Sequence, residues 1–186
     1  MTKPALLLID LQQGFDETFF TRGGRNNLDA ESNIANALAT WREHQYPVIH
    51  IQHASSNVKS PLHPDNKGFA FKEAFQPLPN EQHYTKSVNS AFIGTPLENY
   101  LRQQGIEQIV VAGLTTDHCV STTVRMAGNL GFNVTLLEDA TATFGREHKN
   151  THYAADDIHR YHCMSLDGEF CQVKMTEEVI KLVSKH

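Results

Sequence analysis

Three residues whose side chains could together break a covalent bond lie at or shortly after the ends of predicted strands: Asp10, Lys86 and Cys119. Asp10 closes the apolar run 5–9, and an ionisable group at such an end is partly desolvated, which makes a carboxylate a better base. Cys119 follows the apolar run 109–112 and opens a predicted helix, whose positive end favours a thiolate. A lysine near a thiol also favours the thiolate and can polarise a carbonyl group. The three residues therefore indicate nucleophilic catalysis by a cysteine.

Each of these residues, taken alone, also has a purely structural interpretation. Asp10 could cap a turn through its own side chain, Cys119 could be a buried and inert thiol, and Lys86 could be a solvated surface cation. The small polar residues before Cys119 favour a tight turn, in which Thr116 or Asp117 would cap the helix. Free backbone N–H groups at such a turn can hold an oxyanion, so the position of Cys119 favours the catalytic interpretation of this residue.

The composition narrows the possible functions. The 186 residues carry a formal net charge of -5, with 40% hydrophobic and 20% charged residues, which is typical of one globular domain spanning 1–186. Because basic runs and long apolar stretches are absent from the sequence, we expect neither nucleic-acid nor membrane binding. The three cysteines lack CxxC spacing, which argues against a disulfide framework or a zinc site. We therefore expect a reduced, cytoplasmic protein in which Cys163 and Cys171 are structural.

Apolar strands alternate with amphipathic helices along the chain, which predicts a three-layer α/β/α, Rossmann-like fold with a mostly parallel sheet and helices on both faces. Ligands of such sheets bind beyond the carboxyl ends of the strands. The polar stretch 52–82 has little periodicity, and a loop of this length usually has a function. The expected strands are 5–9, 48–51, 83–86, 109–112, 134–137 and 170–173, and the expected helices are 30–44, 96–104, 119–130, 154–164 and one from Thr176.

Several segments together resemble the isochorismatase-like cysteine hydrolases, the family of nicotinamidases, carbamoyl-amide hydrolases and isochorismatases. The matching segments are Leu8-Ile9-Asp10-Leu11-Gln12 with Phe15, Lys86 with Ser90-Ala91-Phe92, Gly113-Leu114-Thr115-Thr116-Asp117-His118-Cys119-Val120 with Thr123 and Arg125, Gly131-Phe132 with Asp139-Ala140-Thr141, and Ser165-Leu166 with Gly168-Glu169-Phe170. They follow one another over nearly the whole chain. The resemblance implies a six-stranded, mostly parallel sheet between helices and assembly into a homo-oligomer, either a dimer or a tetramer.

The same resemblance assigns roles to the three candidate catalytic residues. Asp10 would take the thiol proton and later return it to the leaving nitrogen. Cys119 would attack a carbonyl carbon and form a thioester, and Lys86 would hold the charges of both partners in place. A cis peptide bond between Leu114 and Thr115 is also implied, with the backbone N–H groups of Thr115 and Cys119 as the oxyanion hole.

The chain departs from the nicotinamidases of this family at their metal site. Those enzymes carry an Asp-x-His pair and a further histidine, whereas this chain reads Ile51-Gln52-His53-Ala54-Ser55, without the aspartate. We interpret His50, His53 and His63 as polar loop side chains, and a zinc site built from them is the alternative. The prediction is therefore an enzyme that needs no metal and no cofactor, for which nicotinamide is a weaker substrate candidate.

Several side chains near these segments could shape a pocket for a small-molecule substrate. The predicted substrate contacts are Phe15, Phe92, His118 and Thr141. Further aromatic candidates are Phe19, Phe20 and Phe144. All these aromatic residues could equally belong to the core or to a subunit interface.

The predicted function is hydrolysis of a C–N bond in a small amide, carbamate or ureido substrate through a thioester acyl-enzyme. One alternative is hydrolysis of a vinyl ether, although isochorismatases usually carry Gly where this chain has Cys119. Another is a catalytically inactive scaffold of the same fold. A nucleotide-binding module is disfavoured because no strand is followed by GxGxxG or a P-loop motif. Thiol redox cycling is disfavoured because no resolving cysteine lies near Cys119 in the sequence.

Overall fold

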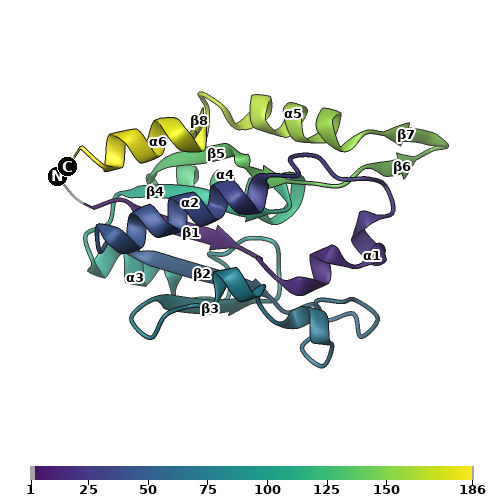
Figure 1. Cartoon of the computed structure of the whole chain (residues 1–186), viewed down its shortest axis with the longest axis horizontal. Coiled ribbons are helices and arrows are strands. Elements are labelled where there is room, and N and C mark those ends of the chain that lie inside the picture. Colours follow the sequence, from purple (N-terminus) through teal and green to yellow (C-terminus); the bar gives the residue numbers. More distant parts are fainter. Residues whose placement is uncertain (1–2, 186) are drawn as a thin grey trace.

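The computed structural model describes residues 3–185 and contains one six-stranded parallel sheet with the strand order β3-β2-β1-β4-β5-β8 (Figure 1). The strands are, in chain order, β1 (Ala5–Ile9), β2 (Val48–His53), β3 (Gln82–Lys86), β4 (Gln108–Leu114), β5 (Asn133–Ala142) and β8 (Gln172–Lys174). From β1 the chain extends the sheet to one side through β2 and β3, and it then returns to β4 on the other side of β1. The strand order therefore reverses between β1 and β4, which is where open α/β sheets bind ligands.

Helices cover both faces of the sheet, and each face has its own apolar core. The helices are α1 (Thr18–Thr21), α2 (Ala30–Glu43), α3 (Leu97–Gln103), α4 (Ser121–Asn129), α5 (Ala155–Leu166) and α6 (Thr176–Val183). Apolar side chains of α2 and α6 pack on one face, and those of α3, α4 and α5 pack on the other. The central strand β1 is fully buried, as a continuous apolar run in a parallel sheet requires. None of the helices in residues 3–185 has the length and apolar character needed to cross a bilayer.

The predicted three-layer α/β/α fold is confirmed, and the differences are local. β2 runs on to His53 and β5 runs on to Ala142, so both strands are longer than their apolar runs. The last strand begins at Gln172, later than predicted, because Cys171 makes only an isolated bridge. A small antiparallel hairpin of β6 (Arg146–His148) and β7 (Thr151–Tyr153), which the sequence pattern did not indicate, projects from the sheet ahead of α5 (Figure 1).

Two backbone positions allow β1 and β4 to approach closely at their carboxyl ends. Gly113 of β4 has φ +127° and pairs with Ile9 of β1. A Cβ atom on Gly113 would lie 2.1 Å from the carbonyl oxygen of Ile9, so only glycine is accommodated. Asp10 follows Ile9 with φ +51°, a left-handed conformation that aspartate adopts more readily than most residues.

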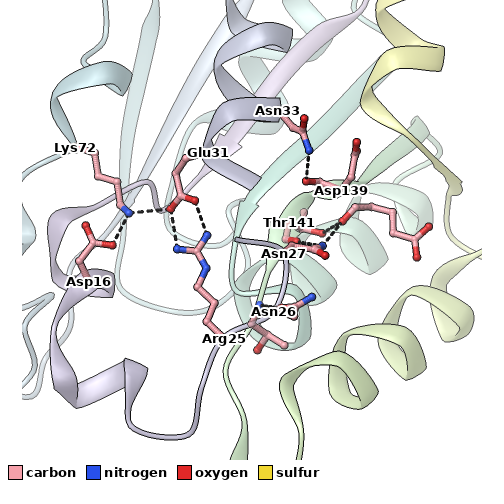
Figure 2. A network of polar contacts seen from close by, with 11 residues as sticks. Asp16, Arg25, Asn26, Asn27, Glu31, Asn33, Lys72, Asp139 and Thr141 are labelled. Carbon is pink, nitrogen blue, oxygen red and sulfur yellow. Dashed lines mark hydrogen bonds and ion pairs between the residues drawn. The ribbon is translucent and has the colours of Figure 1, made fainter. Parts of the chain in front are cut away.

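A charged network ties the long loop between β2 and β3 to the start of α2 (Figure 2). Glu31 accepts two hydrogen bonds from Arg25, at 2.9 and 2.6 Å, and one from Lys72 of the loop at 2.8 Å. Lys72 also binds Asp16 at 2.6 Å. Burial alone would raise the pKa of Glu31, but the hydrogen bonds and charges of Arg25 and Lys72 lower it to about 2. The network therefore holds the segment around Asp16, the segment around Arg25 and the loop that carries Lys72 on the side of the sheet where β1 ends.

Candidate active site

The three predicted catalytic residues meet at the carboxyl edge of the sheet. Lys86 Nζ lies 2.7 Å from Asp10 Oδ2 and 3.1 Å from Cys119 Sγ. Asp10 follows β1, Lys86 ends β3, and Cys119 lies in the turn after β4, so three strands position them. All three are buried, and the side chains of Asp10 and Lys86 have no solvent-accessible surface. The three side chains at strand ends are therefore close together in space, and their catalytic roles stay a prediction.

His53 completes the surroundings of the Lys86 ammonium group. It ends β2 and is the direct register partner of Lys86 on β3. Its Nδ1 lies 3.0 Å from Lys86 Nζ, and because an ammonium group can only donate, Nδ1 accepts this bond. Each of the three Lys86 N–H groups thus has one acceptor: Asp10, Cys119 or His53. Burial, followed by the charge of Lys86, lowers the pKa of His53 and keeps its ring neutral.

The electrostatics of this group favour a protonated thiol at rest. Burial raises the pKa of Cys119, the nearby Asp10 carboxylate raises it further, and Lys86 only partly offsets both effects. Burial alone would lower the pKa of Lys86, but the charges of Asp10 and Cys119 raise it above its usual value. The favourable effect of the nearby lysine on the thiolate is present, but burial and the Asp10 carboxylate outweigh it. The resting group consists of a carboxylate, an ammonium and a neutral thiol.

Cys119 lies in a single π-helical turn, Thr116–Val120, and not at the first position of an α-helix as predicted. The turn follows a cis peptide bond between Leu114 and Thr115, the bond that the family resemblance implied. The N–H groups of His118 and Val120 both donate to the carbonyl oxygen of Thr115, at 3.1 and 3.2 Å, which closes the turn beneath the thiol. The helix α4 continues directly from this turn.

The predicted role of Asp117 as a helix cap is wrong, because no side chain caps this turn. The Asp117 carboxylate instead accepts a hydrogen bond from Thr143 Oγ1 and forms an ion pair with Arg146, both at 2.5 Å. Arg146 begins the β6–β7 hairpin and donates to His118 Nε2 at 3.0 Å. Asp117 thus holds the hairpin beside the turn that carries Cys119.

A cavity of about 420 Å³ opens above Cys119. One wall is aromatic and is formed by Phe15, Phe19, Phe20 and Phe144. The long loop after β2 also lines the cavity, with Ser55, Asn57, Ser60 and Leu62. The prediction that this loop shapes a pocket agrees with its position. A larger cavity, of about 900 Å³, lies around the amino ends of β4 and β5 and contains none of the catalytic candidates, so we assign the site to the smaller cavity.

Of the four predicted substrate contacts, the structure brings two to the pocket. Phe15 and His118 line it, whereas Phe92 and Thr141 do not. The Phe92 ring stacks on Phe132, with centroids 5.9 Å apart, as part of the core beneath α3 and α4. Thr141 is fully buried and its hydroxyl donates to the carbonyl oxygen of Glu138 at 3.2 Å. Both residues have structural positions, and their predicted contact with substrate is corrected accordingly.

Besides the residues of the long loop, three polar residues that line the pocket were not predicted to contact substrate: His53, Asn89 and Arg146. The interpretation of His53 as a loop side chain is wrong, because it ends β2. Asn89 Oδ1 lies 3.9 Å from Cys119 Sγ. A signal for His53 was available, because the rule that functional residues follow strands applies to β2 once this strand is extended to its true end. Arg146 carried no such signal, since its hairpin has no apolar pattern.

The remaining histidines and cysteines lie elsewhere. His50 binds Glu81 at 2.8 Å and His63 lies 3.7 Å from Asp65, so within residues 3–185 they do not form a cluster with His53. Cys163 and Cys171 are buried, and burial raises the pKa of each thiol to about 12. Neither thiol is activated, as predicted.

Known proteins share this fold over its whole length. A crystal structure described as a hydrolase of the isochorismatase family from Chromobacterium violaceum superposes with a TM-score of 0.94 at 42% identity, over 99% of this chain and 95% of that one. The isochorismatase family protein YrdC of Bacillus subtilis is 48% identical over 96% of this chain and 95% of its own length. The maleamate amidohydrolase of Pseudomonas putida is 30% identical over 82% of this chain and 76% of its own length.

The fold and the cysteine site define a Rossmann-like hydrolase. The model of the isochorismatase domain matches residues 4–161, and the chain belongs to the isochorismatase family.

Proposed function

We propose that this protein is a cysteine-dependent amidohydrolase that cleaves a C–N bond of a small amide or ureido compound through a thioester acyl-enzyme. The observation that carries the proposal is the position of the Lys86 ammonium, within hydrogen-bond distance of both the Asp10 carboxylate and the Cys119 thiol at the floor of the pocket. This arrangement supplies a base, a nucleophile and a fixed positive charge in one desolvated place.

In the acylation step, Asp10 removes the thiol proton as Cys119 Sγ attacks the substrate carbonyl carbon. Asp10 Oδ1 is buried and has no hydrogen-bond partner within residues 3–185, so this oxygen is available to receive the proton. The carbonyl oxygen becomes an oxyanion that the N–H groups of Thr115 and Cys119 stabilise. The C–N bond then breaks, the nitrogen takes the proton back from Asp10, and ammonia or an amine leaves.

In the deacylation step, water attacks the thioester carbonyl and gives a proton to Asp10. The C–S bond breaks, the product leaves as a carboxylic or carbamic acid, and the proton returns to the Cys119 sulfur. Lys86 remains an ammonium throughout, and it lies within hydrogen-bond distance of the Asp10 carboxylate before the proton transfer and of the sulfur that develops negative charge during it.

The pocket composition supports a substrate that is flat or apolar at one end and anionic at the other. Phe15 and Phe144 offer ring faces, and their rings are nearly parallel with centroids 6.3 Å apart. Arg146 and His118 also line the pocket, and none of the described residues that line it is an aspartate or a glutamate. The similarity to a maleamate amidohydrolase agrees with this class, because maleamate is an amide that carries a carboxylate.

The test is ammonia release from a panel of small amides, carbamates and ureido acids, each offered with and without a carboxylate. Wild type is compared with Cys119→Ala and with Cys171→Ala, which removes a buried thiol that lies outside the pocket. We expect turnover of at least one carboxylate-bearing member, loss of turnover in Cys119→Ala, and normal turnover in Cys171→Ala. Intact-mass spectrometry of rapidly quenched reactions should show an acyl adduct on Cys119.

Two results would contradict the proposal. Turnover that persists in Cys119→Ala would exclude the thiol as nucleophile. If no member of the panel is hydrolysed while an isochorismate-type vinyl ether is, the reaction is ether hydrolysis and the C–N assignment is wrong.

A further inference from the structure

A second cluster of potential ligands lies away from the catalytic pocket, between β5 and α5. Glu138, His159 and Cys163 each offer one ligand atom, and the three atoms lie within 4.8 Å of one another. His159 and Cys163 are one helical turn apart, at positions i and i+4 of α5, so their side chains share a face. His159 is 6% exposed and Cys163 is 4% exposed, whereas Glu138 is half-buried and connects the cluster to solvent. We call these three residues the Glu138 cluster.

The distance between the two helical ligands matches a shared metal ion. His159 Nε2 lies 3.5 Å from Cys163 Sγ. For Zn²⁺, with metal–nitrogen bonds of about 2.0 Å, metal–sulfur bonds of about 2.3 Å and a tetrahedral angle between them, the nitrogen and sulfur are about 3.5 Å apart. The two side chains therefore already stand at the separation that such an ion requires.

The imidazole of His159 is oriented as a ligand would be. Its Nδ1 lies 2.9 Å from the hydroxyl oxygen of Thr116, and an Nδ1–H that donates there leaves the Nε2 lone pair facing Cys163. The Asn27 amide is 3.4 Å from Nε2 but does not compete, because its two hydrogens go to the carbonyl oxygens of Glu138, at 2.9 Å, and Thr141, at 2.7 Å. In Figure 2 the labelled Asn27 and Thr141 show this pairing.

The charges around the Glu138 cluster attract a cation. The carboxylates of Glu138 and Asp167 act on Cys163, and that of Asp156 acts on His159, where His162 opposes it; Asp117 is already paired with Arg146. No hydrogen bond or ion pair joins the Glu138 carboxylate to another described residue, so it is free to bind. The catalytic group of Asp10, His53 and Cys119 is different, since the Lys86 ammonium already stands among its ligand atoms and would repel a metal ion.

We propose that Glu138, His159 and Cys163 bind one divalent cation of the zinc class, with water as the fourth ligand. The Cys163 thiol releases its proton to solvent when the sulfur–metal bond forms, and His159 binds through Nε2. The three protein ligands come from β5 and α5, so a bound ion would tie these two elements together. Because His159 also contacts Thr116, which opens the turn that carries Cys119, the bound ion would stabilise the floor of the catalytic pocket.

The experiment is a titration of the metal-free full-length chain with Co²⁺, which reports a cysteine ligand through sulfur-to-cobalt charge-transfer absorption in the near ultraviolet. All proteins carry Cys119→Ala, so that the catalytic thiol cannot contribute. We expect a band that saturates at one Co²⁺ per chain, that Zn²⁺ removes by displacement, and that is accompanied by a higher Tm. Cys163→Ser should abolish the band, and the matched control Cys171→Ser should leave it unchanged.

Glu138→Gln is the second variant, because it changes a half-buried carboxylate and leaves the core intact. It should weaken Co²⁺ binding by at least about tenfold, as expected for the loss of an anionic ligand. The proposal is overturned if the near-ultraviolet band is absent or persists in Cys163→Ser. If circular dichroism shows that Cys163→Ser does not fold, Glu138→Gln decides, and an unchanged affinity in this variant refutes the site.

Discussion

Replacing Lys86 with methionine should destabilise the fold, although the new side chain is apolar and of similar length. The ion pair between Lys86 and Asp10 has a separation of 2.7 Å, and neither side chain has solvent-accessible surface. At this distance, with an effective dielectric constant of about 20, the attraction between the two charges is about 6 kcal/mol. Most of this attraction is offset by the desolvation of both charges, so the intact pair contributes little net stability.

The consequence of breaking the pair is much larger than its net contribution. Lys86→Met leaves the Asp10 carboxylate buried without a cation, which costs about 3–5 kcal/mol. Asp10→Asn leaves the ammonium with only the neutral acceptors Cys119 and His53, at a cost in the same range. The double variant contains neither charge and should lie within about 2 kcal/mol of wild type. We therefore predict that each single variant is less stable than the double variant.

The assay is urea unfolding at neutral pH, followed by far-ultraviolet circular dichroism. Lys59→Met is the control, because Lys59 is exposed and its loss should change the free energy of unfolding by less than about 0.5 kcal/mol. All three variants of the pair should lose hydrolase activity, so stability has to be measured separately from turnover. The reasoning is refuted if Lys86→Met costs less than about 1 kcal/mol, or if the two single losses add in the double variant.

Three further predictions concern the surroundings of the site. The pKa of Glu31 is lowered from 4.5 to about 2, so its contribution to the free energy of unfolding is complete above about pH 4.5 and is lost as the pH falls to about 2. After allowance for solvent screening, Glu31→Gln should cost about 1–2 kcal/mol at pH 7 and almost nothing near pH 2, as measured by urea unfolding. Gly113→Ala should prevent folding or lower the Tm by tens of degrees, whereas Gly94→Ala, which places a Cβ in open space at φ +72°, should cost only about 1 kcal/mol in the same thermal melts. Arg146→Met should raise KM about tenfold more for carboxylate-bearing amides than for neutral amides, whose KM changes only through loss of the Asp117 contact that anchors the hairpin, and an equal rise for both would contradict anion recognition by Arg146.

The fold was predictable because burial on both faces leaves a strong signature in sequence. The strands β1 and β4 are continuous apolar runs, and their carboxyl ends could be located without a structure. Parallel strands bring those ends to one edge, which favoured Asp10 and Cys119 as site residues, whereas Lys86 joined them through the family resemblance. The residues that the sequence analysis located correctly are those that follow from the position of strand ends.

The residues that were missed or misplaced depend on contacts between distant segments. Phe92 is close to Lys86 in sequence, but its ring is drawn into the core by Phe132. Arg146 reaches the pocket only because Asp117 anchors its hairpin. Periodicity carries no information about such pairings, since both partners lie in irregular segments or short turns. Pocket walls are therefore less predictable than the catalytic positions on the strands.

A nearby lysine favours a thiolate, but Lys86 is not a partner of the cysteine alone. Lys86 is shared, and the ionised Asp10 at 2.7 Å is its closer partner than Cys119 at 3.1 Å. Under the proposed mechanism, the position of Lys86 between Asp10 and Cys119 favours the proton transfer between them. Transfer of the thiol proton to Asp10 moves one negative charge from the carboxylate to the sulfur, and both positions lie within hydrogen-bond distance of the same ammonium. The buried group keeps the same net charge before and after the transfer, so the burial that raises the thiol pKa does not prevent the nucleophile from forming when substrate is present.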